Sequence, residues 1–293
     1  MIDAPASKSF NARRALRQKN RLSPLVWMNA VCLDAPLVAI SWHWLFARSF
    51  ETAIAAGAIA ALFLTAWLIY LADRFGDSVS IDRHRATSFR QRFCLKHRRA
   101  WLIATALVAA ADVAVVATQL RSAIFLPGAV VGALALVYLL TNQFRPAIWR
   151  VLPAKEIAIG VLFAAGTIVP IAPHLPSAAL LPWCLFAALC TMNCISIAVW
   201  ERWLDNAQQR VSIATAFPRV AGIVLPALLL LAAASFALMR NTDAAAGIYA
   251  CVGISAALLA WTHVCRRRIQ PNVRTALADL VLLTPLVALA ISR

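Results

Sequence analysis

The sequence predicts an all-α membrane protein with nine transmembrane helices. Hydrophobic residues make up 62% of the 293 residues and charged residues 14%, so lipid must solvate much of the surface. Apolar runs of about 20 residues, long enough to cross a hydrocarbon core of about 30 Å as helices, recur along the chain. They occupy residues 25–46, 52–72, 100–118, 123–141, 153–171, 178–200, 220–239, 244–263 and 276–291.

The distribution of basic residues predicts the orientation of these spans. With the N-terminus in the cytoplasm, alternate connections hold all but four of the 28 Lys and Arg residues. The exceptions are Arg48, Arg121, Arg240 and the terminal Arg293. Because Lys and Arg near span ends are retained on the cytoplasmic side, we expect the N-terminus inside and the C-terminus outside. The Ala- and Arg-rich composition and short outer loops favour a bacterial inner membrane.

The chain divides into a basic cytoplasmic segment, residues 1–24, and a single nine-helix membrane domain, residues 25–293. No soluble domain is present to carry a basic patch, which argues against nucleic acid as a partner. The net charge of +16 suits anionic lipid or a phosphorylated substrate, and it is also the ordinary result of the positive-inside rule. Seven cysteines without paired spacing indicate neither a disulfide framework nor a zinc site.

Two acidic motifs echo each other across the chain. Asp73 and Asp77 follow the second apolar run, and Glu201 and Asp205 follow the sixth. Residues four apart share one helix face, and both motifs fall at cytoplasmic span ends, so the four carboxylates can face one another. Mg²⁺ prefers oxygen ligands and commonly binds through one or two carboxylates together with substrate phosphates. The motifs therefore predict a magnesium site for a diphosphate.

Basic residues accompany the acidic motifs, and Arg binds phosphate oxygens bidentately. An arginine directly follows the first acid of each motif, a basic loop follows the first motif, and a lysine begins the fifth span. The candidates for diphosphate binding are Arg74, Arg83, Arg85, Lys155 and Arg202. A positive-inside loop without a ligand would carry the same arginines.

Two further acids lie within predicted spans. Asp34 is in the first span and Asp112 deep in the third. A carboxyl group at that depth is costly and usually faces the bundle interior. Each is a candidate functional site or a hydrogen-bonded link between helices.

With nine spans and acidic motifs after spans two and six, the chain resembles the UbiA superfamily of intramembrane prenyltransferases, whose nine helices surround a central cavity. The resemblance implies that Mg²⁺ held by Asp73, Asp77, Glu201 and Asp205 binds the diphosphate of a polyprenyl donor. It also implies transfer of the prenyl group to a lipophilic acceptor, such as an aromatic ring, within the membrane. Two positions depart from the family pattern, because Ile69 stands where the family has Asn and Glu201 where it has Asp.

Three other functions use parts of the same pattern. A terpene cyclase of this family would need the diphosphate site without an acceptor pocket. A relative that kept the fold but lost activity would bind a lipid or a partner, and Ile69 favours it. An ion-coupled transporter could use Asp34 and Asp112 as ion sites.

Overall fold

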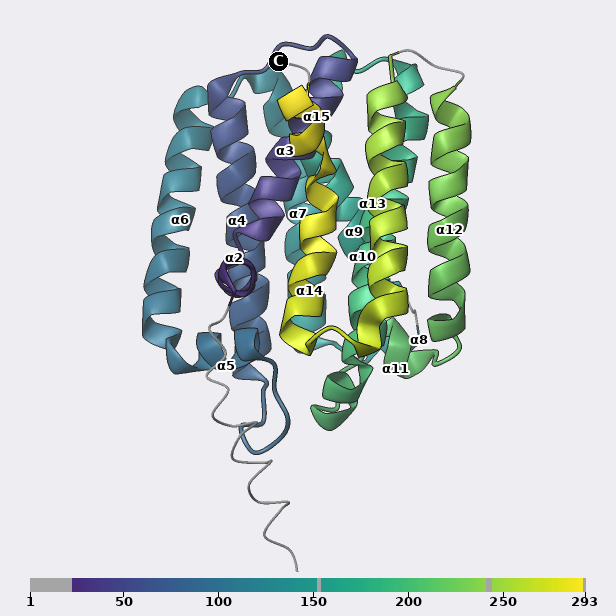
Figure 1. Cartoon of the computed structure of the whole chain (residues 1–293). Helices are drawn as coiled ribbons and strands as arrows, with labels where there is room; N and C mark the ends of the chain where they lie inside the picture. Colours follow the sequence, from purple (N-terminus) through teal and green to yellow (C-terminus); the bar gives the residue numbers. More distant parts are fainter. Residues whose placement is uncertain (1–22, 152–153, 241–243, 292–293) are drawn as a thin grey trace, which may run out of the picture.

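The structure, a computed structural model, describes residues 23–151, 154–240 and 244–291, and within them it contains helices and no strand. Most of the predicted segment 1–24 and the terminal Arg293 lie outside the described residues. Six helices are long and apolar enough to cross a membrane unaided, and they run side by side in Figure 1. They are α4 (Ala56–Val79), α6 (Arg98–Gln119), α7 (Ser122–Phe144), α10 (Leu180–Ala207), α12 (Val220–Met239) and α13 (Ala246–Val264).

The first predicted span is broken. It consists of α2 (Pro24–Ala30) and α3 (Asp34–Ser49), which meet at 91°, so α2 is seen end-on in Figure 1 while α3 rises beside it. Cys32 takes a positive φ of 60° in the break, and the Val31 carbonyl accepts a hydrogen bond from Trp67 Nε1 at 3.0 Å. Backbone freed from a helix within a membrane must find such partners. The prediction of one continuous helix over 25–46 is therefore wrong.

Two other predicted spans are shorter or interrupted. The fifth contains α9 (Lys155–Ile168). The ninth contains α14 (Pro271–Leu280), a 3₁₀ turn η4 (Val281–Leu283) and α15 (Thr284–Ile291). In η4, the Leu282 carbonyl accepts from Trp42 Nε1 at 2.7 Å and the Val281 carbonyl from Ser255 Oγ at 2.8 Å. The described residues thus give six membrane-length helices, or seven with the bent pair, and the predicted count of nine is not confirmed.

The helices differ in how much they contribute to the core and to the lipid-facing surface. Trp42 of α3 stacks on Phe186 of α10, with ring centroids 4.2 Å apart, inside a cluster that also includes α13. By contrast, α6 and α7 turn large side chains outward, including Leu107 and Leu126. Exposed apolar side chains on long apolar helices are the surface expected of a protein solvated by lipid.

The short described helices mark the ends of the bundle. Near the ends of α4 and α10 that carry the acidic motifs lie α5 (Phe89–Lys96), α8 (Ile148–Val151) and α11 (Ile213–Ala216), and the C-terminal end of the chain lies at the opposite side (Figure 1). Three 3₁₀ turns complete the described helices, namely η1 (Ala172–His174), η2 (Ser177–Ala179) and η3 (Cys265–Arg267). Both acidic motifs therefore reach the same face of the protein.

Gly160 lets α9 pack directly on α10. A Cβ at this position would lie 2.6 Å from Thr191 Cα, and small residues allow such close helix packing in membranes. We expect Gly160→Leu to lower the free energy of unfolding by about 1–3 kcal/mol, the usual cost of overpacking. Thermal unfolding in detergent would measure this, with Gly222→Leu as the control because no atom lies within 4 Å of its Cβ position. Equal stability of the two variants would contradict the close contact.

Candidate active site

The first acidic motif lies on the last two turns of α4. Arg210, which follows α10, forms an ion pair with Asp77, with 2.7 Å between Nη1 and Oδ2. Arg210 Nη2 also donates to the Asp77 carbonyl at 2.5 Å and to Ser80 Oγ at 3.1 Å. On the other side, Asn142 Nδ2 of α7 lies 3.5 Å from Asp73 Oδ1. The motif therefore has a guanidinium on one acid and a carboxamide beside the other.

The second motif does not present its two acids in the same way. Glu201 forms an ion pair with Arg90 at 2.5 Å and accepts from Thr275 Oγ1 at 3.0 Å, so it is held toward α5 and α14. Asp205 is partly buried and interacts electrostatically with Lys155 and Arg210. Of the four predicted acids, Glu201 is thus the one whose partners are Arg90 and Thr275 and not Lys155 or Arg210.

Two cations join three of the predicted acids. Lys155, at the start of α9, interacts electrostatically with Asp73, Asp77 and Asp205. Arg210 interacts with the same three carboxylates. Lys155 and Arg210 therefore lie within electrostatic range of three acids from the two motifs.

The neighbour of Lys155 has a separate partner. Glu156 is buried, and its Oε1 accepts from the backbone N–H of Ile213 at 3.0 Å, the first residue of α11. A carboxylate at a helix N-terminus satisfies a free donor. The described contacts give no Lys155–Glu156 ion pair, so the Lys155 ammonium is left for the acidic motifs.

The other predicted phosphate-binding arginines differ in their availability. Arg74 and Arg202 each have a buried Nε without a hydrogen-bond partner among the described residues. Arg83 is exposed on the loop after α4. Arg85 pairs with Asp82 at 3.0 Å and donates to the Ala207 carbonyl at 3.1 Å. Arg85 therefore braces the loop against the end of α10.

Gln208 also connects the loop after α4 to the end of α10, a role that was not predicted from the sequence. Its Nε2 donates to the carbonyls of Asp82 at 3.1 Å and Ala86 at 2.9 Å, and its Oε1 accepts from the Asp82 N–H at 3.0 Å. The loop that follows the first motif is thereby fixed to the residues that follow the second. The sequence feature that could have indicated this role is the position of Gln208, three residues after Asp205.

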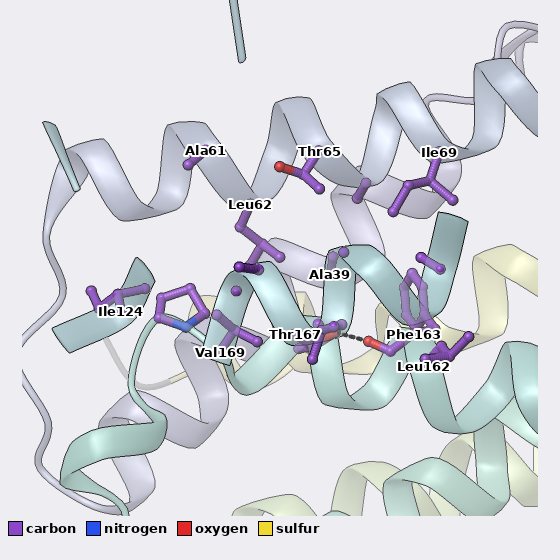
Figure 2. Close-up of a pocket in the computed structure, with 18 of the residues that line it drawn as sticks. Ala39, Ala61, Leu62, Thr65, Ile69, Ile124, Leu162, Phe163, Thr167 and Val169 are labelled. Atoms are coloured by element: carbon purple, nitrogen blue, oxygen red, sulfur yellow. Dashed lines mark hydrogen bonds between the residues drawn. The ribbon is translucent and has the colours of Figure 1, made fainter. Parts of the chain in front are cut away.

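An apolar cavity of about 430 Å³ extends away from the first motif. On α4 it is lined from Ala58 to Tyr70, about 18 Å of helix at 1.5 Å per residue. Figure 2 shows Leu62, Thr65 and Ile69 of α4 facing residues of α9 such as Thr167. Ile69 and Tyr70 of the cavity wall lie about one helical turn from Asp73. The cavity therefore begins beside the acidic site.

The wall of the cavity on α7 combines small residues with a large side chain that is exposed on the outer surface. Gly128, Gly132 and Ala135 line it, and no atom lies within 4 Å of a Cβ placed at Gly132. Phe125 also lines the cavity, yet 60% of its surface is exposed. The cavity therefore borders the exposed surface of α7 at Phe125.

The two intramembrane acids have local partners. Asp112 accepts from Thr65 Oγ1 with both carboxylate oxygens, each at 3.0 Å, which ties α6 to α4 behind the cavity wall. Asp34 accepts from Asn29 Nδ2 at 2.5 Å and from the Ala35 N–H at 3.0 Å. Neither acid lines the cavity. Asp112 therefore fits the structural alternative that its position in the sequence left open.

The acidic residues do not form a complete metal cage. In the described part of the chain, no three His, Cys, Asp or Glu side chains are placed to hold one ion together. Mg²⁺ commonly keeps several waters and takes one or two carboxylates plus substrate phosphates. Asp73 and Asp77, one turn apart beside a cavity, fit an ion that arrives with a diphosphate.

Comparison with known proteins supports the fold. The sequence matches no protein-family model, and no curated protein resembles it significantly in sequence. The structure is similar to the apo structure of a UbiA homolog from Aeropyrum pernix K1, with a TM-score of 0.54 and 16% identity. The match covers 87% of this chain and 98% of the homolog. The chain therefore shares the fold of this UbiA homolog, as the resemblance to the UbiA superfamily implied.

Proposed function

We propose that the protein is an intramembrane prenyltransferase that moves a polyprenyl group from a prenyl diphosphate to a lipophilic acceptor, with Mg²⁺ as cofactor. One observation carries this proposal. Asp73, Asp77 and Asp205 share the cations Lys155 and Arg210 at the end of an apolar cavity that borders the exposed surface of α7. A charged site joined to an apolar cavity suits a substrate with a diphosphate head and a hydrocarbon tail.

Lys155 and Arg210 would bind the diphosphate, and the unpartnered Nε groups of Arg74 and Arg202 would add donors to it. Asp73, Asp77 and Asp205 would hold Mg²⁺, and Glu201 would join them on release from Arg90. The ion would neutralise charge that develops on the departing diphosphate. Donors fixed in advance around that charge stabilise the transition state without reorganisation.

The cavity would hold the prenyl chain and exclude water from the reacting carbon. When the C–O bond to the diphosphate breaks, the electron pair leaves with the diphosphate and an allylic cation remains. Electrons of an acceptor, such as an aromatic ring, form the new bond, and the acceptor then loses a proton. Entry beside Phe125, where the cavity borders the exposed surface, would give a lipophilic acceptor a path from the bilayer.

The proposed setting is a bacterial inner membrane, with the acidic site on the cytoplasmic side. The helix ends that carry the acidic motifs are also the ends that carry Lys155, Arg210 and the basic loop after α4. Because basic segments stay on the cytoplasmic side, a donor would reach the site from the cytoplasm. Membrane lipid would surround α6 and α7.

Mg²⁺-dependent binding of radiolabelled geranyl, farnesyl and geranylgeranyl diphosphates and of a long-chain polyprenyl diphosphate by the purified protein tests the proposal. We expect Asp73→Ala to weaken donor binding roughly ten- to hundredfold, because a charged contact contributes about 1.5–3 kcal/mol. Glu51→Ala is the control, since Glu51 is an exposed acid just before α4, at the opposite end of that helix from Asp73 and Asp77.

Release of diphosphate separates the remaining alternatives. Turnover that requires a lipophilic acceptor would support transfer, whereas turnover without one would indicate a cyclase. Binding without turnover for any tested acceptor would favour a relative that has lost activity. If the folded protein binds none of the donors, the prenyltransferase proposal is wrong and a transporter becomes the better interpretation.

A further inference from the structure

Two helix breaks meet at a cluster of four polar side chains on the side of the bundle away from the cavity wall of α7. Asn29 of α2 donates from Nδ2 to Asp34 Oδ2 at 2.5 Å and to Asp279 Oδ2 at 2.9 Å. Asn193 of α10 donates from Nδ2 to Asp279 Oδ1 at 2.9 Å. Asp34 begins α3 after the 91° bend, and Asp279 lies just before η4. The cluster therefore joins three separate segments of the chain.

The cluster holds two carboxylates without a cation bonded to them. Asp34 and Asp279 are neighbours, because Asn29 Nδ2 contacts an oxygen of each, at 2.5 and 2.9 Å. Arg90 interacts with Asp279 only at longer range, and its guanidinium is paired with Glu201. Two neighbouring carboxylates cannot both stay ionised in a membrane interior without a positive charge between them.

The cluster also offers an oxygen that nothing in the described residues uses. Asn193 is 5% exposed, and its Oδ1 has no hydrogen-bond partner there although its Nδ2 binds Asp279. Asp34 is 4% exposed, whereas Asp279 keeps part of its surface uncovered between the helices that pack on α14. A buried unpartnered oxygen beside two carboxylates is a set of hard donors for a cation.

We propose that Asp34, Asp279 and Asn193 bind one hard monovalent cation, with Na⁺ as the probe, where the two helix breaks meet. One positive charge compensates the like-charged pair and satisfies Asn193 Oδ1. Mg²⁺ suits the site poorly, because it gives up its waters reluctantly and both Asp34 and Asn193 are almost fully buried. Broken helices in membranes commonly supply coordinating oxygens for such ions. The site shares no residue with the proposed diphosphate site.

Thermal unfolding of the purified protein in NaCl and in choline chloride of equal ionic strength tests the proposal, without Mg²⁺ or prenyl diphosphate. A ligand that binds the folded state raises the Tm as its concentration rises. We expect Na⁺ to raise the Tm of the wild type by several degrees, and radioactive sodium to bind with a stoichiometry near one ion per chain. Asp34→Asn and Asp279→Asn should both abolish the response, since Asn keeps the shape and removes the charge.

Two controls locate the site. Asp112→Asn changes another buried acid, bonded to Thr65, and should leave the sodium response intact. Asn193→Ala leaves both carboxylates in place and should weaken sodium binding at least about tenfold, which tests the site even if an Asp variant fails to fold. Equal Tm in the two salts with no bound sodium would overturn the proposal, because a shared proton would then suffice. A response that persists in all three cluster variants would overturn it as well.

Discussion

Replacing Gly132 by leucine should shorten the longest prenyl diphosphate that the protein binds tightly. Gly132 lines the cavity, and nothing lies within 4 Å of its Cβ position, so the new side chain enters empty space and not a neighbouring backbone. Burial of one CH₂ group contributes about 0.8 kcal/mol. A donor that loses the burial of one isoprene unit should therefore bind roughly a hundredfold more weakly or worse.

Competition among geranyl, farnesyl and geranylgeranyl diphosphates would measure this effect. Affinity for the longest donor that fits the wild type should fall, and affinity for geranyl diphosphate should change little because the acidic site is untouched. Gly222→Leu is the matched control, an exposed glycine on α12 with an equally open Cβ position. An equal loss for every donor would show that the prenyl chain does not lie along α7.

Removing Arg210 should change the affinities for magnesium and for the donor in opposite directions. Arg210→Ala frees Asp77 from an ion pair at 2.7 Å, so Mg²⁺ alone should bind more tightly than to the wild type. The donor loses a charged contact worth about 1.5–3 kcal/mol and should bind roughly ten- to hundredfold more weakly. Arg210→Lys should fall between the two, because Lys keeps the charge and loses the bidentate geometry.

Calorimetric titrations with MgCl₂ and with a non-hydrolysable prenyl diphosphonate would separate the two affinities. Arg85→Ala is the control, since Arg85 pairs with Asp82 and the Ala207 carbonyl and not with a motif acid. It should alter neither affinity by more than a few-fold. If Arg210→Ala binds both Mg²⁺ and the diphosphonate more weakly than the wild type, Arg210 stabilises the fold and does not bind the diphosphate.

Hydrophobic run length predicted where helices lie, but it could not predict whether each is continuous. The segment over 25–46 is mostly apolar, and its bend involves Cys32 at φ 60° and Trp67, which is 36 residues away from Val31 in sequence. One local signal was present, because Asp34 two residues before Pro36 is a typical helix start. Composition alone could not reveal the bend, since the backbone groups freed by the break are bonded by side chains of neighbouring helices.

The acidic motifs were informative because their spacing is local, whereas their partners are not. Asp73 and Asp77 lie one turn apart in any helix, so their shared face followed from the sequence. Arg210 meets Asp77 across 133 positions, and Glu201 meets Arg90 across 111. Such contacts depend on how segments far apart in the sequence are placed within the bundle, which spacing within one helix does not specify.

The length of α9 has a consequence for the depth of the site. Its 14 residues extend about 21 Å, while the hydrocarbon core measures about 30 Å, and Gly160 fixes this short helix against α10. Lys155 at its start would then lie below the level of the lipid headgroups. A diphosphate bound there would lie within the membrane, below the headgroups. After the reaction, the released diphosphate would return to water and the prenylated product would diffuse into the surrounding lipid.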